Sequence, residues 1–363
     1  MKQRIASVDV LRGLTIIAMI LVNNPGSWSH VYPPLLHAEW HGLTPTDLVF
    51  PFFLFIVGIS ISYAYASRIA DAKTLKKIGI RSLKLIGLGL FLAWFLPTYP
   101  FIKPYESMRF PGVLQRIGVV FFISAILYLY CNWKQLIAIG CTLLIGYWLF
   151  MGFVPFPDGT LPTFDRAATN WANYIDLKVL GTHMWKDDYD PEGLLSTLPA
   201  IVTCISGILI GKLVQLKSAS TTLYLVITGS VLVSLGYLWS LWFPLNKALW
   251  TSSFVLVTSG YASLILALVY QIIDVKQVKI GSLSKYVGMN AITIFFLSSF
   301  IAKLFYRINI SEDERIHSWL FNTLLADHMS NTTLASLIYA LLVVSFYIAL
   351  GYVLYKKRIF IKV

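Results

Sequence analysis

The sequence predicts an all-α protein, a polytopic integral membrane bundle of about ten transmembrane helices with both termini in the cytoplasm. Apolar residues make up 57% of the 363 residues and charged residues only 13%, whereas a soluble domain carries about 25% charged residues. Most of the chain falls into apolar runs of about 20 residues, the length that crosses a hydrocarbon core of ~30 Å. Lys and Arg are concentrated in alternate loops, which is the pattern that orients membrane helices.

The apolar runs define the predicted elements in order. We expect spans at residues 5–23, 46–67, 80–97, 111–131, 135–153, 194–214, 221–242, 249–272, 287–306 and 334–355. Asp9 and Arg12 interrupt the first run near its start, unlike the apolar segment of a cleavable signal peptide. Because no repeat of fixed short period is present, we treat 1–363 as a single transmembrane domain.

The distribution of basic residues predicts the orientation. The side of the two termini, loops and adjoining span ends together, carries 18 Lys and Arg, and the opposite side carries 9. Positive charge marks the cytoplasmic side, so both termini are expected inside, and ten spans, an even number, agree with this. The net charge of +12 is therefore interpreted as a topology signal, and no nucleic-acid partner is expected.

The loops on the predicted external side are long and varied. They comprise residues 24–45, 98–110, 154–193 and 307–333. The segment 154–193 is rich in Trp, Pro and Asp, which indicates a folded external cap rather than a mobile connector. Its acidic residues would attract a protonated amine, weakly because salt screens such charges; the alternative is a solvated loop.

A polar cluster runs straight into the second predicted span. The stretch LLHAEWHGLTPTDLVFPFFLFIVG, residues 35–58, offers His37, His41, Trp40 and Asp47. Polar groups at the edge of a membrane helix are costly to desolvate and usually have a function. Neutral imidazole accepts a proton near neutral pH, so either histidine is a candidate general base. The alternatives are an interfacial histidine without a role and, for Asp47, an acid at a helix N-terminus.

The first and fourth spans contain further polar residues. Asp9 and Arg12 can pair on one helix face, as a structural anchor or beside a cofactor. Asn23 ends the first span and is either a site residue or a helix stop. Gln115 and Arg116 lie in the fourth span, where a buried guanidinium normally pairs or lines a cavity. Arg116 is expected to bind an anion such as phosphate or to stabilise a carboxylate of the protein.

Three later motifs are also candidates. DYDPEG contains Asp190 and Glu192, which would hold a cation or a sugar hydroxyl, or cap a turn. PLNKALW places Asn246 and Lys247 at the outer end of the eighth span, where Lys247 can also extend its ammonium group to water. GMNAI puts Asn290 in the ninth span, and its amide needs a partner from a helix or a ligand.

Several chemistries lack support. Cys131, Cys141 and Cys204 lie at no metal-binding spacing and indicate no disulfide framework. The chain contains no GxxxxGK[ST], HExxH or GxSxG motif. We therefore expect no metal site, no nucleotide-driven pump and no metalloprotease.

Together these segments resemble the heparan-α-glucosaminide N-acetyltransferase family of transmembrane acetyltransferases. The matching stretches occur in the family's order over nearly the whole chain: SVDVLRG, LVNNPG, HAEWHGLTPTDLVFPFFLFIVG, RFPGVLQRIGV, DPEG, NKALW, GMNAI and YKKRIF. Members of this family move an acetyl group from acetyl-CoA across the membrane to the amine of a terminal glucosamine. The resemblance implies that His37, rather than His41, is the catalytic histidine and that Asn23 is the functional asparagine.

The chemistry of the candidate residues fits this reaction. His37 would take the proton of the amine or accept the acetyl group, and Asn23 would stabilise the reacting carbonyl. The expected contacts of acetyl-CoA, the acyl donor, are Arg12, Arg116, Gln115 and Asn290. The expected contacts of the sugar are Asp47, Trp40, Asp190, Glu192, Asn246 and Lys247.

Two other functions stay open at this point. One is an amino-sugar transporter, and the other is an O-acyltransferase acting on exported or cell-wall glycans. His37 and Asn23 at one membrane face favour the enzyme, since a transporter does not require them. The expected partners are an amino sugar, acetyl-CoA and the lipid bilayer, in a bacterial inner membrane, with a homodimer as an open alternative to a monomer.

Overall fold

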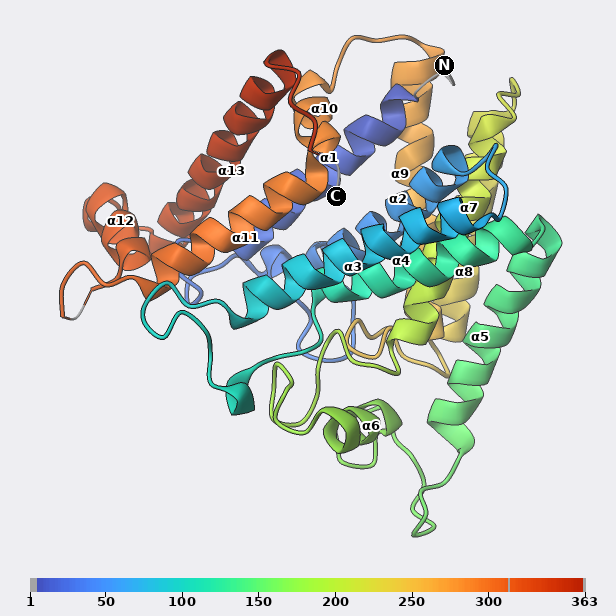
Figure 1. Cartoon of the computed structure of the whole chain (residues 1–363), viewed down its shortest axis with the longest axis horizontal. Coiled ribbons are helices and arrows are strands. Elements are labelled where there is room, and N and C mark those ends of the chain that lie inside the picture. The colour runs from blue at the N-terminus through green and yellow to red at the C-terminus, as the bar shows by residue number, and fades with distance from the viewer. Residues whose placement is uncertain (1–4, 313, 362–363) are drawn as a thin grey trace.

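The computed structural model describes residues 5–312 and 314–361, and its regular elements in this part of the chain are all helical (Figure 1). The α-helices are α1 (Ala6–Asn23), α2 (Val49–Ala64), α3 (Ala72–Trp94), α4 (Val113–Tyr130), α5 (Trp133–Phe153), α6 (Trp171–Leu180), α7 (Thr197–Gln215), α8 (Thr221–Trp239), α9 (Ser252–Tyr270), α10 (Ser282–Met289), α11 (Ala291–Arg307), α12 (Ile316–Leu324) and α13 (Thr332–Lys356). A short 3-10 turn, η2 (Pro45–Leu48), leads into α2.

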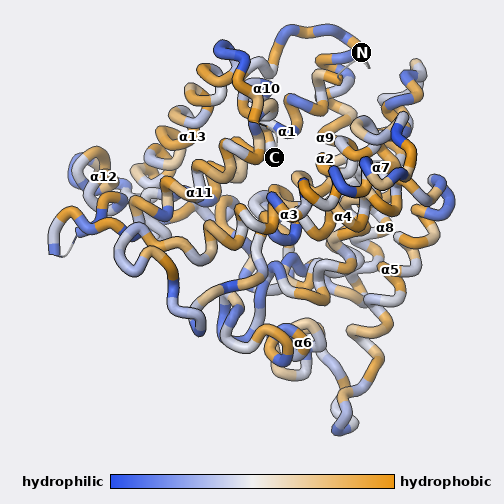
Figure 2. The backbone as a smooth tube through the Cα atoms, in the orientation of Figure 1, coloured by the Kyte–Doolittle hydropathy of each residue, from blue (hydrophilic) through white to orange (hydrophobic). Residues whose placement is uncertain are grey.

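The predicted class, a polytopic helical membrane protein, is confirmed. Within the described residues, eight helices are long and apolar enough to cross a membrane, and the bent pair of α10 and α11 makes a ninth if it forms one span. Figure 2 shows the same division, with hydrophobic residues along the helices and hydrophilic ones mainly at helix ends and in loops. The predicted span 80–97 lies largely in α3, whose first half carries Lys73, Lys76, Lys77, Arg81 and Lys84. Charge of this density is costly in hydrocarbon, so α3 is not among the eight.

The predicted span 287–306 is not one continuous helix. The chain bends by 81° between α10 and α11, and Asn290 lies at the break instead of inside a span. Its side chain is occupied by the C-terminal segment, because Nδ2 donates to Ile359 O at 3.0 Å and Oδ1 accepts from Ile361 N at 2.9 Å. The bend lets α10 pack closely on α1, where a Cβ on Gly288 would lie 2.2 Å from Asp9 O.

The helices divide into a central and a peripheral group. In the most apolar stretch of α2, 72% of the residues are buried, and the value is 67% in α7 and α9, against 22% in α8 and 28% in α5 and α13. The central pair α2 and α7 meets through glycine: a Cβ on Gly207 would lie 1.9 Å from Phe55 O, and one on Gly58 would lie 1.9 Å from Cys204 O. This close approach fixes the helix that carries the polar cluster of residues 35–48 at its start.

We predict that Gly207→Ala lowers the thermal unfolding midpoint of the purified, detergent-solubilised protein. Overpacking a tight core costs about 1–3 kcal/mol, which exceeds the gain of up to about 1 kcal/mol that alanine brings to a helix over glycine. Gly146→Ala in α5 is the matched control, since a Cβ there meets nothing within 4 Å. The control should melt at or above the wild-type midpoint. A Gly207→Ala variant as stable as the control would contradict the proposed close packing of α2 on α7.

Candidate functional site

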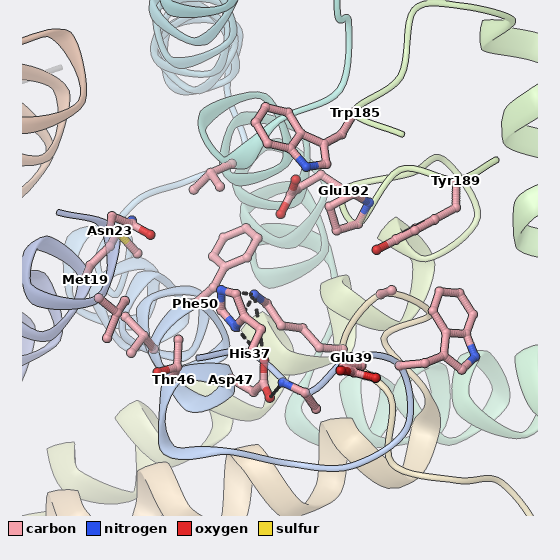
Figure 3. Close-up of a pocket in the computed structure, with 18 of the residues that line it drawn as sticks. Met19, Asn23, His37, Glu39, Thr46, Asp47, Phe50, Trp185, Tyr189 and Glu192 are labelled. Atoms are coloured by element: carbon pink, nitrogen blue, oxygen red, sulfur yellow. Dashed lines mark hydrogen bonds and ion pairs between the residues drawn. The ribbon is translucent and has the colours of Figure 1, made fainter. Parts of the chain in front are cut away.

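A cavity of about 350 Å³ opens where the end of α1, the start of α2 and the 154–193 cap meet (Figure 3). We call it the outer cavity, because part of its wall belongs to the predicted external loops. Among the residues that line it are Met19, Asn23, His37, Glu39, Trp40, Thr46, Asp47, Phe50, Arg109, Trp185, Tyr189, Glu192, Lys247 and Phe295. The polar residues of segments 35–48, 185–192 and 247–248 therefore converge from distant parts of the sequence.

His37 is held in the outer cavity by Asp47. The distance between His37 Nδ1 and Asp47 Oδ1 is 2.7 Å, and Asp47 is only 1% exposed. A carboxylate can only accept, so Nδ1 carries the hydrogen and Nε2 keeps its lone pair. The second Asp47 oxygen accepts from the backbone N–H of Ala38 and from the N–H and hydroxyl of Thr44. The Thr44–Asp47 capping box therefore starts η2 and at the same time orients the imidazole.

Lys247 contacts the same imidazole from the loop between α8 and α9. Its Nζ lies 3.1 Å from each ring nitrogen of His37 and 3.9 Å from Asp47 Oδ1. Burial lowers the pKa of Lys247, and the carboxylates of Glu192 and Asp47 oppose that shift. The two residues are 210 positions apart in the sequence, so only the fold brings them together.

Asn246 supports this loop from within the protein. Its side chain is fully buried, and Oδ1 accepts from Leu249 N at 2.8 Å. Its Nδ2 lies 3.3 Å from His41 Nδ1. Asn246 is not among the residues that line the outer cavity, so the predicted contact with the sugar gains no support from its position.

His41 and Trp40 connect the polar cluster to the cap. His41 Nε2 lies 3.1 Å from Asp165 Oδ1, and Trp40 Nε1 donates to Phe164 O at 2.9 Å. Trp40 lines the outer cavity, where it meets Tyr189 edge to face with 5.1 Å between ring centroids, whereas His41 does not line it. The structure therefore separates the two histidines: His37 faces the cavity and His41 ties a loop to the cap.

Asn23 lines the outer cavity on a different wall from His37 (Figure 3). The next residue, Asn24, is buried and its Nδ2 donates back to Ile20 O at 2.8 Å. The turn that follows is held by the C-terminal part of the chain: His317 Nε2 lies 3.2 Å from Pro25 O, and Gly26 N donates to Ser336 O. Asn24 therefore terminates the helix, and the side chain of Asn23 lines the cavity.

The cap contributes a carboxylate that is held by an arginine. Arg109 binds Asp190 through Nε and Nη2, at 2.7 and 2.5 Å, and also reaches Glu192 Oε2. Asp190 is buried and engaged in this pair away from the cavity, whereas Glu192 lines the cavity. Burial disfavours ionised Glu192, but the nearby cations Arg109, Arg116 and Lys247 outweigh it and hold its pKa below the usual range. Glu192 is therefore an ionised carboxylate at the cavity wall.

Arg116 and Gln115 form the framework beneath the cap. Arg116 Nη2 donates to Gly193 O at 2.9 Å and to Ser196 Oγ, and its guanidinium lies 5.2 Å from the ring centroid of Trp250. Gln115 Nε2 donates to Phe110 O at 3.1 Å. Neither residue lines the outer cavity or the second cavity described next. The expectation that they meet coenzyme A is not supported by this position.

A second cavity, of about 580 Å³, lies toward the end of the bundle that holds the C-terminal segment. We call it the inner cavity; its lining includes Arg12, Phe53, Ser60, Arg81, Asn290, Ile292, Phe360 and Ile361. Arg12 pairs with Asp9 and donates to Ser60 Oγ at 2.8 Å. Arg81 lies 4.7 Å from the ring centroid of Phe121, and its Nε has no hydrogen-bond acceptor among the described residues. Two guanidinium groups therefore face one cavity.

The two cavities are aligned along the same helices. In α2, Phe50 lines the outer cavity and Phe53 the inner one, and three residues are less than one helical turn. Likewise α1 contributes Met19 to the outer and Arg12 to the inner cavity, while α11 contributes Phe295 and Ile292. The two cavities thus approach each other from opposite ends of the bundle.

Several cavity residues were missed by the sequence reasoning. Trp185, Tyr189 and Arg109 lie in loops, where no helical periodicity marks a face. Arg81 lies in the basic run of α3, which was interpreted only as a topology signal. The neighbouring lysines of this run hide Arg81, so no local signal separates it from them.

Comparison with known proteins finds a family and two relatives that this chain resembles. The family described as "Heparan-alpha-glucosaminide N-acetyltransferase, catalytic" matches residues 4–242. The Homo sapiens protein named heparan-alpha-glucosaminide N-acetyltransferase is 30% identical over 426 aligned residues, which cover 99% of this chain and 60% of the human protein. The Mus musculus protein of the same name matches with the same identity and coverage. The chain therefore spans about three fifths of the length of these relatives.

The resemblance seen in the sequence motifs is thereby confirmed. The motifs HAEWHGLTPTDL and DPEG fall within residues 4–242, whereas Lys247 and Asn290 lie beyond that match and within the region aligned to the human and mouse proteins. The likeness thus extends over both cavities. The chain belongs to the heparan-α-glucosaminide N-acetyltransferase family.

Proposed function

We propose that this protein is a membrane-embedded acetyltransferase that moves the acetyl group of acetyl-CoA to the amine of a glucosamine-type sugar. The observation that carries the proposal is the His37–Asp47 pair in the outer cavity, with a second, arginine-lined cavity on the same helices. The human and mouse relatives are named as N-acetyltransferases of heparan-α-glucosaminide, which supports this proposal.

In this proposal His37 carries the proton transfer. An amine must be unprotonated to attack a thioester, and a neutral imidazole within reach takes up the proton that it releases. The Asp47 contact fixes the imidazole with Nε2 as the basic nitrogen and favours the imidazolium that forms. The same nitrogen would attack the thioester if the acetyl group passed through the enzyme. In either case Asn23, on the other wall, would donate to the carbonyl oxygen as negative charge develops.

The inner cavity is the proposed binding site of the donor. Coenzyme A carries several phosphate charges, and guanidinium groups are suited to phosphate because they offer fixed pairs of donors. Arg12 and Arg81 supply such groups. Among the described residues the Nε of Arg81 has no hydrogen-bond acceptor, so it is available to a phosphate oxygen. The helices α1, α2 and α11, which line both cavities, would flank the acyl arm as it extends toward His37.

The outer cavity is the proposed site of the sugar. Glu192 offers an ionised carboxylate to an ammonium or hydroxyl group, and Trp40, Trp185 and Tyr189 offer aromatic faces. A transporter of amino sugars would also need cavities at both ends of the bundle, so that function is the second candidate. It does not require an oriented imidazole, which is why the enzymatic function is preferred.

We predict that His37→Ala lowers the rate of coenzyme A release in the presence of glucosamine about 10²–10⁴-fold, the usual contribution of a general base. Asn23→Ala should lower it about 10²–10³-fold if it is a donor to the developing oxyanion. The assay uses purified protein with acetyl-CoA and glucosamine, and coenzyme A binding confirms that each variant is folded.

His41→Ala is the matched control for His37→Ala, since His41 binds Asp165 outside the cavity. It should keep most of the activity. If His41→Ala is inactive and His37→Ala is not, the base is wrongly assigned. If neither substitution matters while glucosamine crosses proteoliposome membranes, transport is the better function.

We predict that Arg81→Met weakens binding of coenzyme A about 10- to 100-fold, because a hydrogen bond to a charged group contributes about 1.5–3 kcal/mol and each 1.4 kcal/mol is a factor of about ten. Lys84→Met is the control, since Lys84 is exposed on the same helix. Calorimetric titration with coenzyme A and with S-acetylpantetheine, which lacks the phosphates, separates the causes. Equal weakening for both ligands would show that Arg81 supports the cavity and does not bind phosphate.

A further inference from the structure

Lys247 contacts His37 Nε2, the nitrogen to which the proposed function assigns proton transfer. With Nδ1–H donated to Asp47, the only lone pair of the His37 ring lies on Nε2, and Lys247 Nζ is 3.1 Å from it. Nζ is also 3.1 Å from Nδ1, so the ammonium lies over the ring and not along the axis of that lone pair. The base therefore has a proton donor within hydrogen-bond distance before any substrate is present. A lysine that served only to attract substrate would not need this contact.

The groups around Lys247 favour the loss and regain of a proton by its amine. Its side chain is 18% exposed, and the charged or titratable groups that face it come from four elements: Glu192, Asp47, His37 and Arg116. If His37 gained a proton while Lys247 kept all of its own, two cations would face each other in a poorly solvated site, which is unfavourable. The proton that His37 receives therefore has to move on, and Nζ is the adjacent acceptor once it has lost a proton.

The loop that carries Lys247 is built to hold this position. Trp250 N donates to Lys247 O at 3.1 Å, and Asn246 N donates to Thr251 Oγ1 at 3.2 Å. Trp250 is fully buried and has a φ of 52°, a left-handed conformation that a tryptophan rarely adopts without support from its surroundings. The motif NKALW thus holds the side chain of Lys247 near Glu192 and His37.

We propose that Lys247 is the second proton-transfer residue: it donates a proton to the sulfur of the departing coenzyme A and regains one from His37. This rests on the proposed function. The amine nitrogen forms a bond to the acetyl carbon as the carbon–sulfur bond breaks, and the electron pair of that bond goes to sulfur. Sulfur takes the proton of Lys247, the amine proton goes to His37 Nε2, and His37 then passes it to the neutral Nζ. Both residues return to their initial states.

The same proton balance holds if the acetyl group passes through His37 Nε2. In that case Lys247 again protonates the departing sulfur, and its neutral amine takes the proton of the incoming sugar amine directly. The relay is therefore independent of whether transfer is direct or occurs in two steps.

The test uses the full-length protein with three substitutions. Lys247→Ala should lower kcat about 10²-fold or more, while the KM for glucosamine changes less than threefold. Lys247→Arg keeps the positive charge but cannot release a proton near neutral pH, so it should be as slow as the alanine variant. Lys186→Ala, at an exposed lysine of the cap, is the control and should match the wild type.

Chemical rescue separates the relay from a positioning role. Small primary amines added to Lys247→Ala should restore coenzyme A release. The restored rate should depend on the pKa of the amine, and the pH above which that rate falls should shift with the pKa. Wild-type rates in Lys247→Arg, or an alanine variant that is folded and fully active, would overturn the relay. So would a slow, folded alanine variant that amines of differing pKa fail to restore.

The proposed function fails in a different way. If wild-type protein releases no coenzyme A with glucosamine, or if His37→Ala is fully active, the chemistry assigned to the outer cavity is wrong. If His37→Ala is inactive and the Lys247 variants are normal, the function stands and only the relay is excluded.

Discussion

The outer cavity depends on Asp47, a buried carboxylate whose two oxygens bind the His37 imidazole and the turn at Thr44. One oxygen binds His37, and the other accepts three hydrogen bonds from Ala38 and Thr44. The loop of residues 35–48 and the start of the membrane helix are thereby fixed to one another. A buried carboxylate is stable only when its lone pairs are matched in this way, so the orientation of the imidazole and the local fold have a common cause.

The packing of the bundle fixes the position of the helix that follows this loop. The close contact between α2 and α7 at Gly58 and Gly207 positions the helix that follows Asp47, and this helix carries Phe50 and Phe53 to the two cavities. Arg109 and Arg116 hold the 190–196 segment above it through Asp190, Glu192 and Gly193. An inner arginine-lined cavity and an outer cavity with an oriented base are what the transfer of an acyl group between opposite faces would require.

Local sequence patterns predicted the helical class and the polar cluster, because apolar run length and side-chain type are properties of neighbouring residues. They predicted Asp47 as a sugar contact or as an acid at a helix N-terminus, and they did not show that this helix-capping acid is also the partner of His37. They identified Arg116 as a buried cation but could not tell which groups it meets. The contact of Lys247 with His37 and the break at Asn290 arise from tertiary packing, so no local pattern contains them.

Asp47→Asn tests whether Asp47 holds His37 in the tautomer with a basic Nε2. The amide is nearly isosteric, but its NH₂ group can donate to Nδ1 and so favour the opposite tautomer. The measurement is coenzyme A release with glucosamine, alongside the thermal unfolding midpoint and coenzyme A affinity. We expect a rate at least about 10²-fold lower in a protein that still folds and binds coenzyme A. A folded Asp47→Asn variant with the wild-type rate would contradict this role of Asp47.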